Sequence, residues 1–174
     1  MLKLDFDPKW VQLAMETITT ASYSVLINGE PYGFIKPIRG LKQGDPLSPY
    51  LFLLCAEGLS AMLRIAEHTL RGLKASQHGV CISHLLFADD SLLFCRATVE
   101  ECQRLLDLLK TYEAASGQSI NRQKTSLFFS TNTKPEVRKV IQKMMGARVM
   151  ANCEKYLGLP MVCGKSKVNT FKEL

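Results

Sequence analysis

The sequence lacks the cysteine and histidine patterns that build zinc sites. It contains no C-x-x-C pair, and its three histidines, at 68, 78 and 84, complete no paired set of ligands with the cysteines. Isolated cysteines in a chain of this kind are usually small buried hydrophobic residues. We therefore expect no zinc site and predict reduced, mostly buried thiols at the six cysteine positions, which are 55, 81, 95, 102, 153 and 163.

Long hydrophobic runs are also missing. The longest unbroken apolar stretch, residues 51–56, is far shorter than the roughly 20 apolar residues that a membrane-spanning helix needs. Near the N-terminus, Lys3 is followed by acidic residues and not by the apolar core of a signal peptide. These absences predict a soluble, intracellular protein of the nucleus or cytoplasm that has no membrane partner.

A nucleotide-binding P-loop is absent as well. Gly164, Lys165 and Ser166 match the end of that motif, but the position that requires the first glycine is Leu159. Gly158 is one residue out of register, and no strand–loop–helix pattern surrounds the match. We interpret the match as a coincidence.

The chain contains enough hydrophobic residues to form one core, and its charged residues are unevenly distributed along the sequence. With 174 residues, 47% of them hydrophobic, it can bury roughly 70% of its unfolded surface. Residues 1–120 carry 11 basic and 13 acidic side chains, whereas residues 121–174 carry 11 basic and 3 acidic ones. A basic C-terminal third suits contact with a phosphate backbone, although a solvated helix face has the same composition.

Asp89 and Asp90 lie side by side between two apolar runs, residues 85–88 and 91–94. A two-residue break between β-prone runs predicts a tight hairpin with both carboxylates at its tip. At about 5 Å and an effective dielectric constant of about 20, the two charges repel each other by roughly 3 kcal/mol. A divalent cation would remove that repulsion in a cleft, but aspartate is also an ordinary turn residue.

A glycine-containing loop precedes the longest apolar helix pattern. Gly40 and Gly44 flank Lys42 and Gln43 and allow the backbone to approach a ligand closely. Ser48 then offers an N-cap, and Pro49 follows as a first helical residue. A glycine loop that leads into a helix N-terminus can bind anions. Taken by itself, however, the same pattern also fits a connecting loop before a core helix that binds no ligand. The predicted buried face of that helix consists of Leu51, Phe52, Leu54, Cys55, Leu59, Met62, Leu63 and Ala66.

Elsewhere the residue pattern predicts alternating strands and helices, that is, an α+β protein without internal repeats. Asn28 and Gly29 predict a turn between a strand at residues 22–27 and another near residues 34–38. Residues 71–79 form a looser stretch, and residues 127–130 a further strand. Asp7 with Pro8 predicts the start of a first helix, whose expected buried face is Trp10, Val11, Ala14, Met15 and Ile18.

Two capping boxes predict the two later helices. Thr98 with Glu101 begins one that ends at Gly117, and Thr133 with Glu136 begins one that ends at Gly146. The first of these helices should bury Cys102, Leu105, Leu106, Leu109 and Tyr112. The second should bury Val137, Val140, Ile141, Met144 and Met145 and should expose Lys134, Arg138, Lys139 and Lys143.

Taken together, these stretches resemble the palm of reverse transcriptases. The segment GLKQGDPLSPYLF at residues 40–52, followed by LLFADDSLLF at residues 85–94, is similar to non-LTR (LINE-like) retrotransposon enzymes of the plant type. Three further segments fit the family in the same order: SYSVLINGEP before the glycine loop, SGQSINRQKTSLFF after the aspartate hairpin, and YLGLP in the position of the primer-grip hairpin. The resemblance covers nearly the whole chain, so residues 1–174 are predicted to be one partial reverse transcriptase domain.

The resemblance implies a polymerase palm-like antiparallel sheet packed on helices, incomplete at both ends. The first of three metal-binding aspartates should lie on an upstream strand in a segment resembling KAYD, which this sequence does not contain. The thumb and the start of the fingers are also expected to be missing. Asp5 and Asp7 are interpreted as structural, because their segment resembles the loop and helix after that strand.

The resemblance also implies a role for each candidate residue. Asp89 and Asp90 would hold Mg²⁺, or Mn²⁺ in its place, against the primer 3′ hydroxyl and the nucleotide phosphates. Lys124, held in a loop that Asn121 helps to fix, could donate a proton to the departing pyrophosphate, or it could be a plain surface lysine beside Arg122. Residues implied in nucleotide and template binding are Gly40, Lys42, Gln43, Gly44, Pro46, Phe87 and Ala88, and the primer grip would consist of Tyr156, Leu157 and Gly158.

The activity implied is DNA synthesis on an RNA template. Its partners would be that template, a DNA primer, deoxynucleoside triphosphates and the remainder of a longer polyprotein. The alternative is a catalytically inactive retroelement remnant that at most binds nucleic acid. Because the chain contains two of the three aspartates, we expect negligible polymerase activity from it alone.

Overall fold

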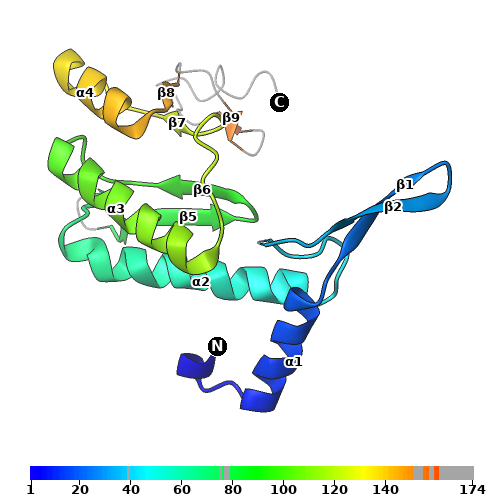
Figure 1. Cartoon of the computed structure of the whole chain (residues 1–174). Coiled ribbons are helices and arrows are strands. Elements are labelled where there is room, and N and C mark those ends of the chain that lie inside the picture. Colours follow the sequence, from blue (N-terminus) through cyan, green and yellow to red (C-terminus); the bar gives the residue numbers. More distant parts are fainter. Residues whose placement is uncertain (39, 75, 77–78, 151–154, 157–158, 161–174) are drawn as a thin grey trace. The chain divides into compact units, whose positions relative to one another are not determined.

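The protein is described here by a computed structural model that covers residues 1–38, 40–74, 76, 79–150, 155–156 and 159–160. Helices and short strands alternate along the chain, which confirms the expected α+β class (Figure 1). The described strands pair two by two, and four of the five pairs are antiparallel. The chain divides into two compact units, Met1–Ile65 with Lys110–Gln118, and Ala66–Leu109 with Ser119–Leu174.

The first unit begins with a short 3₁₀ turn at Leu2–Leu4 and helix α1 at Pro8–Thr19. The Asp7 carboxylate accepts hydrogen bonds from the backbone N–H groups of Lys9 (2.8 Å) and Trp10 (3.3 Å), so the predicted N-cap is confirmed. The predicted buried face is confirmed in part. Ala14 is buried, and Val11 and Ile18 are half-buried, but the exposed fractions of Trp10 and Met15 are 37% and 41%. The Trp10 ring stacks instead on the Phe6 ring, with 5.1 Å between centroids.

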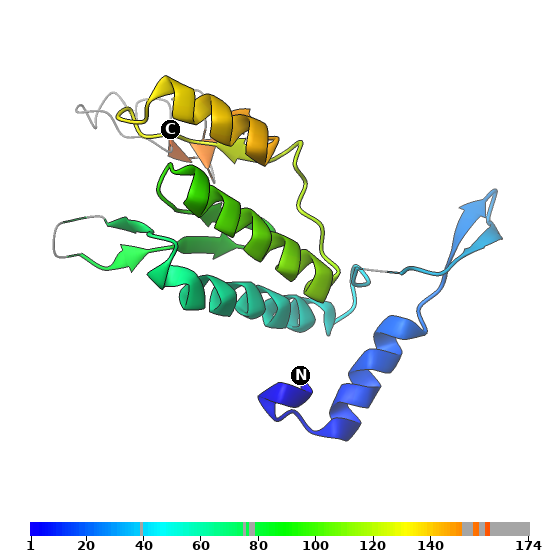
Figure 2. The same ribbon diagram turned by 60° about the vertical axis from the view of Figure 1, so that its left-hand side comes forward.

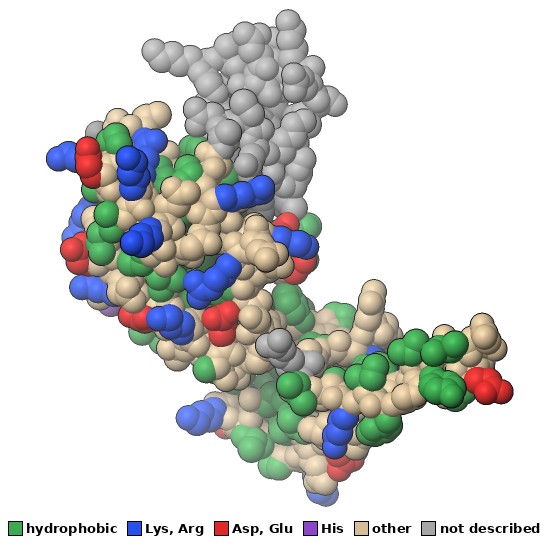
Figure 3. All heavy atoms as spheres, turned by 45° about the horizontal axis from the view of Figure 1, so that its top comes forward, with side chains coloured by type: hydrophobic (Ala, Val, Ile, Leu, Met, Phe, Trp, Pro, Cys, Tyr) green, Lys and Arg blue, Asp and Glu red, His purple; other side chains and the backbone are tan. Residues whose placement is uncertain are grey.

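Strands β1 (Tyr23–Ile27) and β2 (Glu30–Ile35) form an antiparallel hairpin. Asn28 and Gly29 both have positive φ, 52° and 86°, as expected of the predicted two-residue turn. The second strand starts at Glu30, directly after this turn, and so begins earlier than predicted. Hydrophobic side chains line this arm and stay exposed (Figure 3), namely Tyr23, Val25, Leu26, Ile27, Tyr32, Phe34 and Ile35.

Helix α2 spans Ser48–Ile65, and Ala66–His68 continues it as a 3₁₀ turn. Leu51, Leu59 and Leu63 are buried, while the other predicted core residues of this helix are half-buried. By length and composition, Ser48–His68 is apolar enough to cross a membrane, although its longest unbroken apolar run is short. The core helix of a soluble protein passes the same test, so this helix alone does not indicate a membrane.

Helix α3 spans Val99–Ser116 and ends at Gly117, whose φ of 71° is typical of a helix C-terminus. Its predicted apolar face is confirmed, because all five side chains are at most 9% exposed. The hairpin of β5 (His84–Phe87) and β6 (Asp90–Leu93) lies beside this helix in both ribbon views (Figures 1 and 2). The loose stretch expected before it contains a small antiparallel pair, β3 (Leu73–Lys74) and β4 (Cys81–Ile82).

After α3, strand β7 (Ser126–Leu127), helix α4 (Pro135–Met145) and strand β8 (Arg148–Val149) form a crossover between parallel strands (Figure 2). The predicted capping box at Thr133 and Glu136 is wrong, because the N-cap is Lys134 and no side chain caps it. Ile141 is buried as predicted, but Val140 is 50% exposed. Strand β7 is shorter than the strand that was expected at residues 127–130. Strand β8 was not predicted, because a two-residue strand is too short to show a periodic pattern.

Candidate functional site

The aspartate hairpin is built by strict pairing of β5 with β6. His84 pairs with Leu93 and Phe87 pairs with Asp90, which leaves Ala88 and Asp89 as the two turn residues. The prediction of a tight hairpin is confirmed. The prediction that both aspartates form its tip is wrong by one residue, because Asp90 is the first residue of β6 and Ala88 belongs to the turn.

Ala88 has a positive φ of 48°, an unusual conformation for a residue with a Cβ atom. Asp89 is not among the positive-φ residues, so the signs of φ match a type II′ turn, in which glycine is the usual first residue. The turn is therefore held in its shape by the pairing of the strands on either side.

Both carboxylates of the hairpin are exposed. Residues directly opposite each other in an antiparallel pair share a face, so Asp90 lies on the same face as Phe87, which is 58% exposed. Leu85 lies on this face too and is 48% exposed. One face of the hairpin thus combines an accessible carboxylate with accessible apolar side chains, while Leu86 on the opposite face is half-buried.

The base of the hairpin is fixed by a buried carboxylate that the sequence did not single out as functional. Glu101 is 8% exposed, and its Oε2 atom accepts hydrogen bonds from the backbone N–H groups of Arg71 and Arg96, both at 3.0 Å. The predicted capping box is half correct, because the Thr98 hydroxyl accepts from the Glu101 N–H at 3.3 Å. In a complete capping box the Glu101 carboxylate would accept from the Thr98 N–H, but here it accepts from the N–H groups of Arg71 and Arg96. Glu101 therefore joins α3 to the segments before β3 and after β6.

Ser83 forms a second anchor at the same end. Its carbonyl oxygen accepts from the Phe94 N–H at 2.8 Å, and its hydroxyl donates to the Glu67 carboxylate at 3.2 Å. The hydroxyl also lies 2.9 Å from the Nδ1 atom of His84. This is not a hydrolase triad, because there the histidine must lie between serine and carboxylate, whereas here serine is in the middle.

In the first unit, the glycine loop is closed by hydrogen bonds of its own. The Ser48 hydroxyl donates to the Lys42 carbonyl oxygen (2.7 Å), and the Asp45 carboxylate accepts from the Leu47 N–H (2.8 Å). The predicted N-cap role of Ser48 is wrong, since Ser48 is already the first residue of α2 and its hydroxyl donates backwards. Asp45, a turn-forming residue that the prediction passed over, accepts the bond next to the helix start.

The glycines of this loop are required by backbone conformation. Gly40 and Gly44 have φ values of 90° and 82°, which residues with a Cβ atom rarely adopt, while the space around both is open. Gln43 and Gly44 form the turn of the loop, and Asp45 and Ser48 close it. The structure therefore brings together the loop residues that the sequence predicted, Gly40, Lys42, Gln43, Gly44 and Pro46.

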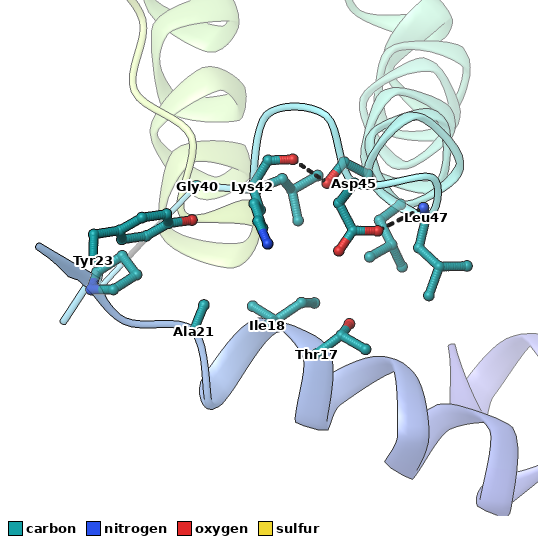
Figure 4. Close-up of a pocket in the computed structure, with 12 residues that line it drawn as sticks. Thr17, Ile18, Ala21, Tyr23, Gly40, Lys42, Asp45 and Leu47 are labelled. Atoms are coloured by element: carbon teal, nitrogen blue, oxygen red, sulfur yellow. Dashed lines mark hydrogen bonds between the residues drawn. The ribbon is translucent and has the colours of Figure 1, made fainter. Parts of the chain in front are cut away.

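A cavity of about 200 Å³ lies between this loop and the C-terminal end of α1. The side chains of Lys42 and Asp45 point toward it from the loop, and Thr17, Ile18 and Ala21 form the opposite wall (Figure 4). The cavity is therefore bordered by the positive charge of Lys42 and the negative charge of Asp45 on one side and by side chains of α1 on the other, and it is large enough for a small chemical group. The prediction had placed Lys42 at the nucleotide but had not identified this cavity.

Lys124 lies in a loop that Asn121 fixes as expected. The Asn121 side-chain oxygen accepts from the N–H groups of Gln123 (3.1 Å) and Lys124 (3.2 Å), and its carbonyl oxygen accepts from Thr125 (3.0 Å). The Lys124 side chain is exposed. Neighbouring Arg122 donates to the carbonyl oxygen of Met145 at 3.5 Å, near the C-terminal end of α4. The role of Lys124 stays a prediction.

The predicted primer-grip segment forms a hairpin in the backbone. Strands β9 (Lys155–Tyr156) and β10 (Leu159–Pro160) pair antiparallel, with Tyr156 opposite Leu159. The predicted residues Leu157 and Gly158 lie outside the described residues.

Among the described residues of the basic C-terminal third, Arg138 is held by contacts within the chain. Arg138 donates through Nε to the Thr133 carbonyl oxygen (3.0 Å) and through Nη2 to that of Ser130 (2.8 Å), and it lies 5.9 Å from the Phe129 ring centroid. It thus holds the start of α4, while Lys139 and Lys143 stay exposed.

Comparison with known proteins identifies relatives of this chain. The family model for reverse transcriptase (RNA-dependent DNA polymerase) matches residues 2–161. An uncharacterized mitochondrial protein of Arabidopsis thaliana is 54% identical over 68 residues, which is 38% of this chain and 56% of that protein. A retrovirus-related Pol polyprotein from the type-1 retrotransposable element R2 of Popillia japonica is 39% identical over 80 residues, which is 45% of this chain but 12% of the polyprotein. The chain thus spans only part of the length of both relatives.

Proposed function

The chain belongs to the reverse transcriptase family, and on that basis we propose that it forms the catalytic-hairpin part of an RNA-directed DNA polymerase. The proposed source is a non-LTR retrotransposon, in line with its similarity to the R2 polyprotein. The observation that carries the proposal is the hairpin itself, which holds Asp89 in its turn and Asp90 at the start of β6, inside the matched region. In this proposal β5 and β6 are two strands of a palm-like sheet, and the complete sheet would pair with an upstream strand.

Reverse transcriptases use divalent metal ions, and the donor set of the hairpin fits such an ion in part. Asp89 and Asp90 supply adjacent, exposed carboxylates, the hard oxygen ligands that Mg²⁺ and Mn²⁺ prefer. Within the described residues, no group of three His, Cys, Asp or Glu side chains gathers in one place. We therefore propose that the two aspartates hold Mg²⁺ together with substrate phosphates and with an aspartate outside this chain.

When bound, the metal would lower the pKa of the primer 3′ hydroxyl and neutralise charge on the departing pyrophosphate. The residues of the chain would orient the substrates. Asp89 and Asp90 would place the reacting end of the primer, while Phe87 and Ala88 would contact it from the hairpin. Gln43 and Gly44 would line the site against template and nucleotide, with their loop held rigid by Asp45 and Ser48.

Two further roles complete the proposal. Tyr156 and its hairpin would position the primer strand, and Lys124 would donate a proton to the leaving pyrophosphate. The substrates proposed are an RNA template, a DNA primer and deoxynucleoside triphosphates, met inside the cell in the nucleus or cytoplasm. The partners would include the rest of a longer polyprotein, because the chain spans 12% of the R2 polyprotein that it resembles.

A second candidate function is an inactive retroelement remnant that binds nucleic acid. It is considered because, within the described residues, the hairpin supplies two adjacent carboxylates and no group of three His, Cys, Asp or Glu side chains gathers in one place. The exposed apolar side chains of β1 and β2 fit either candidate, because a longer polymerase could cover them and a remnant would leave them bare. Metal binding at the hairpin distinguishes the two, since a remnant has no need to preserve it.

Metal binding can be measured on the chain as it is. In ¹⁵N-labelled protein, we expect substoichiometric Mn²⁺ to broaden the amide signals of residues 88–91 first, because both carboxylates lie there. Excess Mg²⁺ should reverse the broadening by competing for the same oxygen ligands.

The matched variants are Asp89→Asn with Asp90→Asn, which removes both charges, and Asp5→Asn, which removes one exposed aspartate in the other unit. The double variant should lose the local broadening, and the Asp5 variant should keep it. Broadening that survives in the double variant, or that is as strong around unrelated carboxylates, would contradict a metal site at the hairpin.

A further inference from the structure

The crossover formed by β7, α4 and β8 is strongly basic. Residues 119–150, which contain it, carry seven basic side chains and one acidic side chain. The acidic residue is Glu136, which lies in the first turn of α4. Because an ordinary solvated helix face can have the same composition, the arrangement of the cations has to show whether they form a binding surface.

Two contacts bring arginines from different segments to the C-terminal end of α4. Arg122, in the loop before β7, donates to the carbonyl oxygen of Met145, the last residue of the helix, at 3.5 Å. Arg148, the first residue of β8, lies opposite Ser126 in the parallel pair, and its Nε donates to the Ser126 hydroxyl at 2.9 Å. Both arginines are exposed. The crossover therefore places two guanidinium groups at the end where α4 leads into β8.

Helix α4 adds two lysines on its exposed face. Lys139 and Lys143 are both exposed, and four positions place them on one face of a helix, about 6 Å apart along its axis. Ile141, on the opposite side, is 1% exposed and fixes which face of α4 is turned outward. The lysines therefore continue the positive charge from the C-terminal end of α4 along its outer face.

The remaining charges of the helix show where this surface ends. Arg138 is engaged by carbonyl oxygens at the start of α4, and Glu136 lies three positions before Lys139 and offsets positive charge there. The contact of Arg122 with a helix carbonyl also stabilises the helix C-terminus. A guanidinium has five N–H donors, however, so this one bond leaves Arg122 able to bind an anion.

We propose that the exposed cations at the C-terminal end and on the outer face of α4 bind the phosphate backbone of a nucleic acid strand. These residues, here called the α4 cations, are Arg122, Lys139, Lys143 and Arg148. Guanidinium groups match the geometry of phosphate oxygens, and ammonium groups act as point charges. Each neutralised phosphate releases counterions, so the binding depends strongly on salt. It depends on neither base nor sugar, because charged contacts to phosphates carry no sequence information.

This surface is distinct from the residues to which the proposed function gives a role. None of the α4 cations belongs to the aspartate hairpin, the glycine loop or the predicted primer grip, and Lys124 is not one of them. A polymerase and an inactive remnant would bind a strand here in the same way. The two proposals therefore fail separately, because metal binding at the hairpin tests the first and strand binding at α4 tests the second.

The test measures the affinity of the full chain for a labelled single-stranded RNA, and for the DNA strand of the same sequence, by fluorescence anisotropy at several KCl concentrations. We expect both strands to bind with similar affinity. Replacing all four α4 cations by Gln should weaken binding more than tenfold at low salt. The slope of log affinity against log salt should become shallower by about 3, since each phosphate contact on a single strand contributes about 0.7.

A control variant separates the surface from the overall charge of the chain. It replaces four exposed lysines outside the crossover by Gln, which are Lys3, Lys9, Lys36 and Lys74. Both variants lose four positive charges from the net +6, but the control should stay within about threefold of the parent.

A milder variant keeps the test decisive if the loss of Arg122 and Arg148 unfolds the crossover. Lys139→Gln with Lys143→Gln removes two exposed charges, and no hydrogen bond or ion pair of either side chain is found within the described residues. This variant should keep the far-UV circular dichroism spectrum of the parent. Its slope should become shallower by about 1.4.

Equal affinities and slopes for the α4 variants and the lysine control would overturn the proposal, because binding would then follow net charge alone. A parent chain that binds neither strand would overturn it too, as would one that binds RNA but not DNA. Polyglutamate that binds as tightly as the nucleic acids would contradict a site for a phosphate backbone.

Discussion

Replacing Asp89 by Asn in a polymerase that contains this chain is expected to lower the rate of primer extension by about 10³-fold, with little change in folding. Asp89 occupies the turn between β5 and β6 and is exposed, and no hydrogen bond or ion pair of its carboxylate is found within the described residues. Asparagine keeps the size and the turn preference of the side chain. What it removes is the negative charge that would hold a divalent cation against the phosphates.

The matched control is Asp5→Asn, another exposed aspartate whose left-handed backbone (φ 57°) asparagine also accepts. This variant should leave extension unchanged. The Asp90→Asn variant should also lose activity, because it removes the second of the two adjacent carboxylates. The measurement is single-turnover extension of a labelled DNA primer on an RNA template across a range of Mg²⁺ concentrations. An Asp89→Asn enzyme within tenfold of the parent would remove Asp89 from the catalytic site.

The Glu101→Ala substitution is expected to lower the free energy of unfolding by about 3 kcal/mol, the largest stability effect that we anticipate at a single side chain. One carboxylate oxygen accepts two backbone N–H groups, those of Arg71 and Arg96, and the residue is 8% exposed. Alanine leaves both donors without this acceptor, and each part-buried, charge-assisted bond contributes about 1.5 kcal/mol or more. Urea denaturation followed by far-UV circular dichroism measures the loss.

The Glu101→Gln variant separates the bonds from the bulk of the side chain. Its amide oxygen can accept the same bonds without the charge, so it should lose about 1 kcal/mol. The Glu100→Ala variant, on the exposed neighbouring residue, should change stability by less than about 0.5 kcal/mol. If Glu101→Ala were as mild as Glu100→Ala, the buried carboxylate would not be what holds the base of the hairpin.

Features decided by local physics could be predicted from the sequence. The Asp7 cap depends on its neighbours alone, and so does the Asn28–Gly29 turn. The buried face of α3 was predicted because one long helix carries the whole pattern, from Cys102 to Tyr112. The candidate site was predicted in outline for the same reason, because a two-residue break between β-prone runs identifies a hairpin.

Features decided by pairing or by distant partners could not be predicted in this way. The register of β5 and β6 is set by all four residue pairs between the two strands, and this register places Ala88 in the turn. The sequence alone suggested a turn that begins one residue later. Glu101 was recognised as a capping residue, but its bond to Arg71, thirty positions away, has no sequence pattern. The apolar face of α1 was predicted to be buried, yet Trp10 and Met15 are exposed, because hydrophobic periodicity shows which side chains share a face of a helix but not whether another element covers that face.

We propose that the β5–β6 hairpin of this reverse transcriptase family chain supplies Asp89 and Asp90 as metal-binding aspartates. The most direct test is primer extension on an RNA template with Mg²⁺, using the purified chain, its Asp89→Ala variant, and the chain joined to a palm strand that carries the first aspartate. We predict no extension by the first two proteins and measurable extension by the third. Extension by the chain alone that disappears in the Asp89→Ala variant would contradict this account, because two aspartates would then be enough for catalysis.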